Sequence, residues 1–197
     1  PTPDAAGAFF ELFTPAPPPY RVVLDVTIGG ASSGMARIDA AVSGADYHAN
    51  VRVELAGLPA RDSEIVYVGD TGYLREHGAE QWVVVPGYRS TPPLNPFLLL
   101  DPADFADAGS DPAHAGLRRL SSSTWVEDDA TLGLASGGVR EVEFEIWVDG
   151  AGVPVEAALD FGLVGTDQSG ADVALTYSAR YAFSDVGGEI TIEAPTS

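Results

Sequence analysis

Cysteine and lysine are both absent from this 197-residue sequence, and each absence narrows the functions that it can have. Without cysteine the chain offers no disulfide and no thiol chemistry. Its ten basic residues are all arginine and stand against 29 acidic ones, so the formal net charge is −19. A chain this acidic lacks the cationic surface with which proteins bind nucleic acids and anionic lipid headgroups. We therefore expect no nucleic-acid partner.

Long apolar runs and catalytic motifs are also missing. No run is long enough to span a bilayer as a helix. The three histidines, His48, His77 and His114, have no neighbour at metal-ligand spacing, so we expect solvated side chains, no metal and no cofactor. The hydroxyls at 121–124 lie outside any Gly-x-Ser-x-Gly motif, and no motif singles out one acidic residue. The sequence therefore predicts a protein that is not an enzyme.

What the sequence has in abundance is the alternation of apolar and polar residues, the period of a strand with one buried face. Residues 20–28 alternate in this way, and so do 47–55, 139–148, 155–161 and 173–183. Turn sequences separate these segments, as at Gly69–Gly72 and Asp149–Pro154. Consecutive hairpins of this kind predict an antiparallel sheet with one apolar face. A further strand is expected at 189–195, which closes the chain.

Two regions break the alternation. Residues 5–13, AAGAFFELF, predict a short helix, and the prolines of 14–20 predict a stiff connector after it. Between 91 and 120 an N-cap residue precedes proline at three helix starts: Asn95–Pro96, Asp101–Pro102 and Asp111–Pro112. We expect residues 1–19 to form the helix and connector, and residues 20–197 to form a single domain.

These helices are too few to cover the apolar face. About ten strands present on the order of 1,000 Å² on one face, whereas a helix of about 12 residues covers about 180 Å². The sheet must therefore either close on itself, as a barrel or sandwich, or curl partway and leave an apolar hollow for a ligand. The many valines and alanines at interior positions favour the hollow, because small side chains leave room.

Three stretches carry a family resemblance: EFEIWVDGAGVPVEAALDF, then DVALTYSARYAFSDVGGEITIEAP, and upstream VYVGDTGYLREHGAEQWVVVP. Their most specific features are the strand end at Trp147–Asp149, the strand ending in Tyr181–Asp185, and Ile190–Ile192 before Pro195. These stretches resemble the LppX/LprAFG family of bacterial cell-envelope lipoproteins, over nearly the whole chain from about Tyr20.

The resemblance implies an α+β fold of the LolA/LolB type, a strongly curved antiparallel β half-barrel with a few short helices covering its concave apolar face. It also implies non-catalytic binding and transfer of lipids or glycolipids, with acyl chains in an apolar cavity, outside the cytoplasm in the cell envelope. Members of the family are anchored to a membrane by a lipidated cysteine. Since this sequence contains none, we expect such an anchor ahead of Pro1.

On this interpretation a lipid or glycolipid would contact one set of apolar side chains. The expected set is Val22, Leu24, Val26, Phe97, Leu99, Leu100, Val142, Phe144, Ile146, Leu159, Leu175 and Tyr177. The stretch from Phe97 to Phe105 is open to two interpretations, a lid over the ligand or plain core. Two other functions also remain open: an envelope sensor or protein-interaction module without cargo, and an envelope hydrolase.

Overall fold

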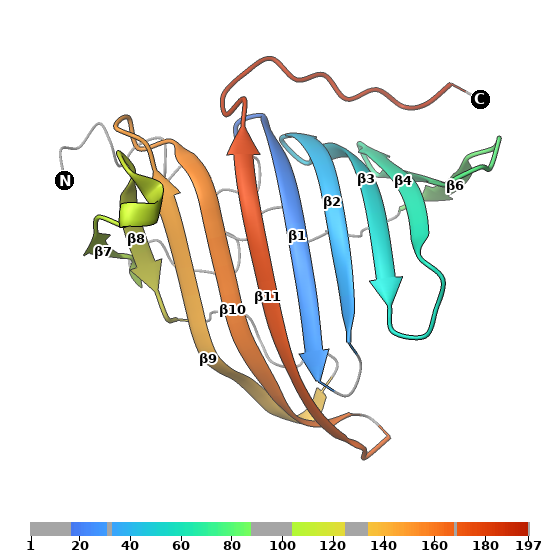
Figure 1. The fold of residues 1–197 in the computed structure, drawn as a ribbon. Coiled ribbons are helices and arrows are strands. Elements are labelled where there is room, and N and C mark those ends of the chain that lie inside the picture. Colours follow the sequence, from blue (N-terminus) through green and yellow to red (C-terminus); the bar gives the residue numbers. More distant parts are fainter. Residues whose placement is uncertain (1–16, 31–32, 88–103, 125–133, 168, 197) are drawn as a thin grey trace.

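The computed structural model describes residues 17–30, 33–87, 104–124, 134–167 and 169–196. These residues form one open sheet of eleven strands, in the order β6-β5-β4-β3-β2-β1-β11-β10-β9-β8-β7 (Figure 1). All the strand pairs in it are antiparallel. The antiparallel pairing predicted from alternation and turns is therefore confirmed.

Two meanders make up this sheet. The first contains β1 (Tyr20–Gly30), β2 (Gly34–Ser43), β3 (Asp46–Leu55), β4 (Arg61–Val68), β5 (Thr71–Glu76) and β6 (Val83–Pro86). The second contains β7 (Ala106–Gly109), β8 (Arg118–Ser122), β9 (Leu134–Val148), β10 (Pro154–Asp167) and β11 (Asp172–Ser184). They meet where β1 pairs with β11, with Val22 opposite Phe183. The first and last strands of the described residues thus lie next to each other in the middle of the sheet.

The tight turns expected from the sequence are present. β4 and β5 are joined by Gly69 and Asp70, and Gly69 has a φ of 65°. Between β9 and β10 the carboxylate of Asp149 accepts hydrogen bonds from the backbone N–H groups of Ala151 and Val153, at 2.8 and 2.9 Å. Because a carboxylate organises this loop locally, the register between the two long strands is fixed at their upper end.

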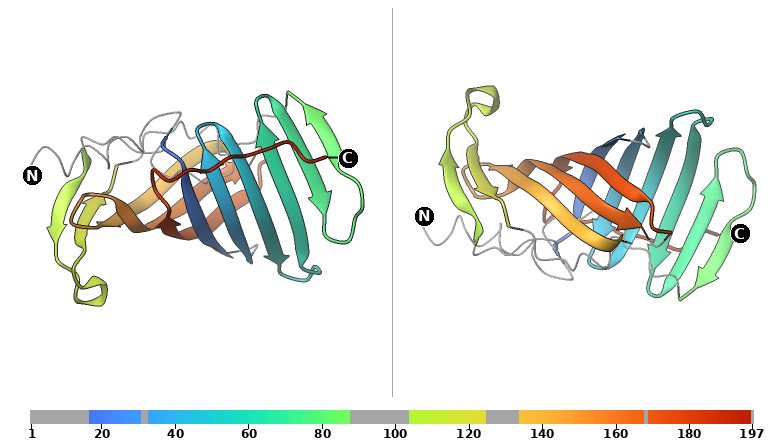
Figure 2. Two further views of the ribbon diagram at one scale, coloured as in Figure 1. Left: turned by 90° about the horizontal axis from the view of Figure 1, so that it is seen from above. Right: turned by 90° about the horizontal axis from the view of Figure 1, so that it is seen from below.

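Strands β9 and β10 deviate from regular pairing lower down. Their register shifts between Asp160 and Gly162, opposite Glu141, which has a φ of 53°. Further along, Gly137 has a φ of 108°, and a side chain there would collide with the carbonyl group of Val164. Bulges of this kind bend a strand and increase its twist. Figure 2 shows the outcome, with the strands of the two meanders crossing at an angle.

The expected α+β class, with helices over a concave face, is wrong for the described residues, which are nearly all strand and contain no α-helix. The helix start at Asp111 yields only a 3₁₀ turn, η3 (Pro112–His114). Its N-cap forms as predicted, since the Asp111 carboxylate accepts from the N–H of Ala113 at 2.9 Å. Gly116, at a φ of 87°, then ends the turn. The other expected helices, at 5–13, Asn95–Pro96 and Asp101–Pro102, lie outside the described residues.

The strand expected at 189–195 is also wrong. These residues are extended but belong to no strand, and they cross the upper ends of the first meander toward β6 (Figures 1 and 2). The segment is held at its start, where the N–H of Gly187 donates to the carbonyl oxygen of Pro19 at 2.7 Å. Because β1 already pairs with β2 and β11, no free backbone edge is available where β11 ends.

Candidate functional site

The two faces of the sheet differ sharply in chemistry. On one face, register places Val51, Ile38, Leu24, Tyr181, Ala157, Ile146 and Leu120 side by side in a row across seven strands. We call this the apolar face. The opposite face carries the alternate residues of the same strands, among them Asp25, Arg37 and Arg180, and we call it the polar face. This division follows directly from the period of two in the sequence.

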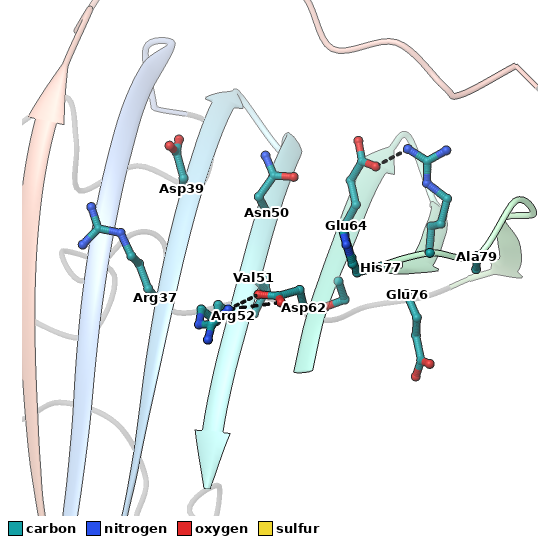
Figure 3. A pocket seen from close by; sticks show the side chains of 13 residues that line it. Arg37, Asp39, Asn50, Val51, Arg52, Asp62, Glu64, Glu76, His77 and Ala79 are labelled. Atoms are coloured by element: carbon teal, nitrogen blue, oxygen red, sulfur yellow. Dashed lines mark hydrogen bonds and ion pairs between the residues drawn. The ribbon is translucent and has the colours of Figure 1, made fainter. Parts of the chain in front are cut away.

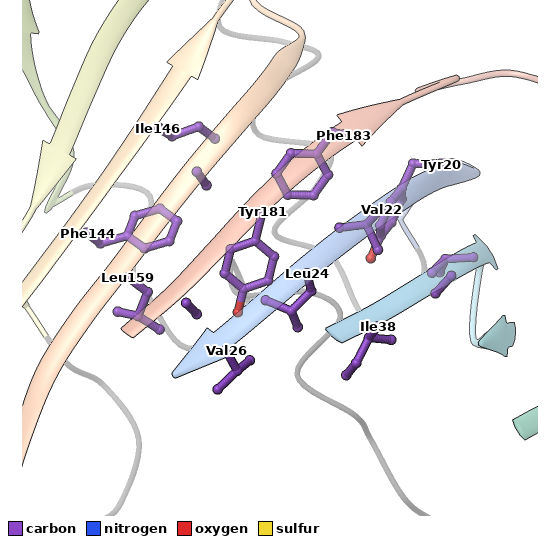
Figure 4. Close-up of a cluster of buried hydrophobic side chains, with 14 of the residues drawn as sticks. Tyr20, Val22, Leu24, Val26, Ile38, Phe144, Ile146, Leu159, Tyr181 and Phe183 are labelled. Carbon is purple, nitrogen blue, oxygen red and sulfur yellow. The ribbon is translucent and has the colours of Figure 1, made fainter. Parts of the chain in front are cut away.

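The centre of the apolar face is a buried cluster (Figure 4). Its members come from β1, β2, β3, β8, β9, β10 and β11, and four of them are alanines, Ala40, Ala49, Ala157 and Ala179. Among its members that are less than 2% exposed, the largest are Tyr20, Phe144, Leu24, Ile146 and Leu159. Each such side chain contributes about 1.5–3 kcal/mol through its removal from water. The cluster therefore supplies the main stabilisation of the sheet.

The expected lining residues fall into three groups. Six belong to the buried cluster: Val22, Leu24, Val26, Phe144, Ile146 and Leu159. Val142 and Tyr177 are partly buried against that cluster, and Leu175 lies two residues before Tyr177 on the same face of β11. Phe97, Leu99 and Leu100 lie outside the described residues. The structure thus brings nine of the expected residues onto one face, and whether they contact a ligand stays a prediction.

Three phenol groups lie on the apolar face near the central strand pair. Tyr20 is on β1, whereas Tyr177 and Tyr181 are on β11. Burial raises the pKa of Tyr177 to about 12 and raises the pKa of Tyr20 and Tyr181 still further. Tyr181 stacks on Phe183 at 6.0 Å between ring centroids, and Tyr177 stacks on Phe161 at 4.7 Å. All three phenols therefore remain protonated, as hydrogen-bond donors, at any physiological pH.

Toward β6 the apolar face becomes exposed. Leu55 is 47% exposed, Leu58 62% and Leu74 38%, and Val83 and Val85 on β6 are exposed as well. Val53, Leu55, Leu58, Pro59 and Leu74 line an open pocket of ≈ 420 Å³, together with Arg61 and Glu76. Small-molecule sites have this size and this mixture of apolar walls with a few polar groups. Sequence alternation predicted the apolar face of these strands but gave no sign that this end stays open.

A groove on the polar face, of ≈ 340 Å³, has a different character (Figure 3). Three guanidinium groups line it, and each is paired with carboxylates. Arg37 bonds to Asp25, Arg52 bonds to Glu54 and Asp62, and Arg75 bonds to Glu64. Since these cations are already neutralised and partly solvated, the groove is a network of surface ion pairs, each of which contributes little to stability.

Glu64 sits between two cationic partners in this groove. Burial alone would raise the pKa of its carboxyl, but hydrogen bonds from Arg75 and His48 outweigh burial and hold the pKa below its usual value. The ring nitrogen Nε2 of His48 lies 2.8 Å from the Glu64 carboxylate. Glu64 is therefore a carboxylate at neutral pH and has no proton to donate, so the groove offers no general acid at this position.

Another contact network lies over Trp147 on the polar face. The ring of His114 stacks on the indole at 4.3 Å between centroids. Its Nδ1 lies 2.7 Å from the carboxylate of Asp111 and its Nε2 lies 3.1 Å from that of Glu156. The hydrogen bond to Asp111 raises the pKa of His114, against the opposing effect of burial. The expectation of a solvated histidine is therefore wrong for His114, which fastens η3 to β9 and β10.

Neither metal binding nor membrane insertion of a helix is indicated in the described part of the chain. No group of three His, Asp or Glu side chains there could hold a metal ion. None of its helices has the length and apolarity needed to cross a membrane.

No family model and no curated protein matches the chain. A LolA superfamily protein, NE2245 from Nitrosomonas europaea, is similar with 11% identity and a TM-score of 0.33, covering 95% of this chain and 94% of that chain. A chain of the Pseudomonas aeruginosa MucA/MucB complex is similar with 16% identity and a TM-score of 0.36, covering 91% of this chain and 55% of that chain.

A third similar structure is a beta-barrel-like protein of a domain of unknown function, DUF1849, from Brucella abortus. It shares 14% identity and a TM-score of 0.21, covering 84% of this chain and 95% of that chain. At TM-scores this low the three structures carry no structural or functional argument for this chain. The resemblance to the LppX/LprAFG family stays a prediction from the sequence.

Proposed function

We propose that this protein binds amphiphiles non-catalytically, with their acyl chains against the apolar face of the sheet. The proposed ligands are lipids or glycolipids, which the protein would carry through the bacterial cell envelope. One observation supports the proposal above the others. The apolar face extends beyond the buried cluster to the exposed Leu55, Leu58 and Leu74, around an open pocket of ≈ 420 Å³.

The energetics of such binding are simple. Each methylene group that leaves water contributes about 0.8 kcal/mol, so ten of them supply on the order of 8 kcal/mol before the entropy of association is subtracted. Affinity of this origin needs few polar contacts. Arg61, Asp62, Ser63 and Glu76 also line this pocket, so polar groups border its apolar wall.

In this conformation a ligand would first meet the partly buried side chains of the apolar face. These surround the central cluster and include Ile28, Val51, Ile65, Val142, Phe161 and Tyr177. Deeper members of the expected lining, such as Leu24 and Phe144, would contact it only after side chains of the cluster move apart. We propose that residues 20–197 act as one binding unit, located outside the cytoplasm and anchored to a membrane by a lipidated segment ahead of Pro1.

A second candidate function is a sensor or protein-interaction module that carries no cargo. Strand β6 favours it, because β6 ends the sheet in the described residues and Val83, Val84 and Val85 are all exposed. An exposed edge strand of this kind can pair with an extended segment of another protein. The two functions differ in whether the purified protein takes up lipid.

Uptake can be measured with the fluorescent probe N-phenyl-1-naphthylamine, whose emission rises in an apolar site, and with native mass spectrometry after incubation with phospholipid. We expect saturable probe binding that dioleoyl phosphatidylethanolamine displaces. Leu74→Glu should weaken probe binding about tenfold or more, because it removes apolar contact worth at least 1.4 kcal/mol and brings a charge into the pocket.

Val84→Glu is the matched control. Val84 is an exposed apolar residue of the neighbouring strand, 53% exposed, and lies on the polar face opposite Tyr73. It should leave probe binding unchanged. A protein that takes up neither probe nor phospholipid, or one in which both substitutions act equally, would contradict the proposed function and leave the interaction module as the better account.

A further inference from the structure

Tyr181 has a buried hydroxyl group without a partner. Its side chain is 2% exposed, and its Oη makes no hydrogen bond within the part of the chain that the structure describes. Buried polar atoms in folded proteins are almost always hydrogen-bonded, and an unsatisfied one costs about as much as a lost hydrogen bond. Such a group in a native protein needs an explanation. A hydrogen-bond acceptor on a bound ligand would provide one.

Among the described residues, the neighbours of the Tyr181 hydroxyl provide no hydrogen-bond acceptor. The hydroxyl points along the sheet toward Val26, away from Phe183 (Figure 4). Residues opposite and beside it in the register are Leu24 on β1 and Ala157 on β10, both apolar. The ring itself is held in place by stacking on Phe183. The donor therefore lies in an apolar environment, and an acceptor from outside reaches it when neighbouring side chains of the cluster move apart.

The Tyr181 hydroxyl points toward the more accessible part of the apolar face. Two repeats of the pleat further down β11, beyond Ala179, Tyr177 lies opposite Ile28 and Phe161, and all three are only partly buried. Burial raises the pKa of the Tyr181 hydroxyl, and the charges that Tyr177 and Tyr20 would carry raise it further. An amphiphile seated on Tyr177 would thus bring its polar oxygens close to Tyr181.

We propose that the Tyr181 hydroxyl donates a hydrogen bond to an ester carbonyl oxygen of a bound acyl lipid. This inference rests on the proposed function and adds a specificity to it. Ester-linked chains present a carbonyl acceptor where they join the headgroup, whereas ether-linked chains present only a weak acceptor. The site therefore selects acyl esters over alkyl ethers of equal length.

The test compares two lipids, dioleoylglycerol and its dioleyl ether analogue. Each competes with the fluorescent probe N-phenyl-1-naphthylamine, and the loss of probe emission gives its affinity. The wild-type protein should bind the ester about tenfold more tightly than the ether, the effect of one buried hydrogen bond. Tyr181→Phe keeps the ring and its stacking, and should reduce ester affinity to that of the ether. Tyr67→Phe removes the same atom from the same face, four strands away, and should preserve the preference.

Thermal unfolding of the ligand-free protein gives an independent readout. Tyr181→Phe should raise Tm, because it removes an unsatisfied buried hydroxyl. A lower Tm would mean that the hydroxyl already has an acceptor, which overturns the inference. Equal binding of ester and ether to the wild type, unchanged in Tyr181→Phe, also overturns it but leaves the proposed function standing. If the protein binds neither the ester nor the ether, both this inference and the proposed function are wrong.

Discussion

The positions and pKa values of single residues in this protein depend on contacts between different elements. His114 is the clearest example. It stacks on Trp147 of β9, bonds to Asp111 beside it, and reaches Glu156 of β10. The pKa of His114 is raised first by Asp111, and Glu156 adds to the effect. The pKa of Asp111 is lowered first by the N–H of Ala113 and then by His114. Both shifts favour the charged pair in the folded state.

These shifts predict a dependence of stability on pH. Because the folded pKa of His114 lies above its ordinary value of 6.5, its contribution is complete below pH 6.5 and is lost as pH rises through the folded pKa. The folded pKa of Asp111 lies below 3.8, so its contribution is present above pH 3.8 and is lost as pH falls through the folded value. Stability from this contact is therefore greatest between the two.

The measurement is the Tm of the wild type and of His114→Asn, determined by circular dichroism from about pH 5 to about pH 9. We expect the variant to be less stable at mildly acidic pH and the difference to shrink as pH rises above 6.5. His77→Asn, at an exposed histidine of the turn after β5, is the control for replacing a histidine by asparagine. A difference that grows with pH would contradict the assignment.

The sequence allowed the local contact at Asp111 to be predicted, but not the contacts between distant residues. The N-cap at Asp111 is a local signal, since it depends on a carboxylate two residues before the N–H that it binds. The partners of His114 and Tyr181 could not be predicted in the same way. Glu156 is distant in the chain, and the orphan state of a hydroxyl depends on every neighbour across the sheet.

At the scale of elements, the paired strands β9 and β10 combine regular ladders with three register shifts, at Pro154/Glu156, Asp160/Gly162 and Thr166/Asp167. Alternation alone placed Val142, Phe144, Ile146 and Val148 on one face, and the structure confirms this for the upper part of β9. It gave no sign of the shift between Asp160 and Gly162, because a bulge changes the period only locally. The helix expected after Asp111 failed for a related reason: a good N-cap starts a helix, but Gly116 limits η3 to one turn.

Gly137 provides a test of the lower bend. Gly137→Ala should destabilise the protein by about 1–3 kcal/mol, because its φ of 108° suits glycine and a methyl group would meet the carbonyl of Val164. Gly150→Ala is the control, since nothing lies within 4 Å of a side chain added there. Chemical denaturation measures both. Equal effects of the two substitutions would show that β9 and β10 do not approach each other closely at Gly137.

The whole molecule carries a large excess of negative charge, with 29 acidic residues against ten arginines. Several arginines are already paired on the polar face, as Arg37 is with Asp25. The unpaired carboxylates repel one another over distances longer than a salt bridge, and salt screens that repulsion. Composition alone predicted the excess, whereas the pairing of individual arginines required the register of the strands.

We expect Tm to rise as sodium chloride increases from about 0.01 M to about 0.5 M, because screening relieves the repulsion more than it weakens exposed ion pairs. Differential scanning calorimetry at constant pH measures the effect. Potassium sulfate is unsuitable here, since sulfate strengthens apolar burial by a separate route. A fall in Tm over this range would show that local ion pairs outweigh the net repulsion.

The pairing of β1 with β11 has a consequence for how the chain acquires its structure. A ribosome releases Val22 long before Phe183, so one backbone edge of β1 remains unpaired until β11 has emerged. Contacts between such distant residues form slowly, and open edges invite mispairing with other chains in the interval. Loss of the final strand would therefore split the sheet down its middle, whereas loss of β6 would only shorten it.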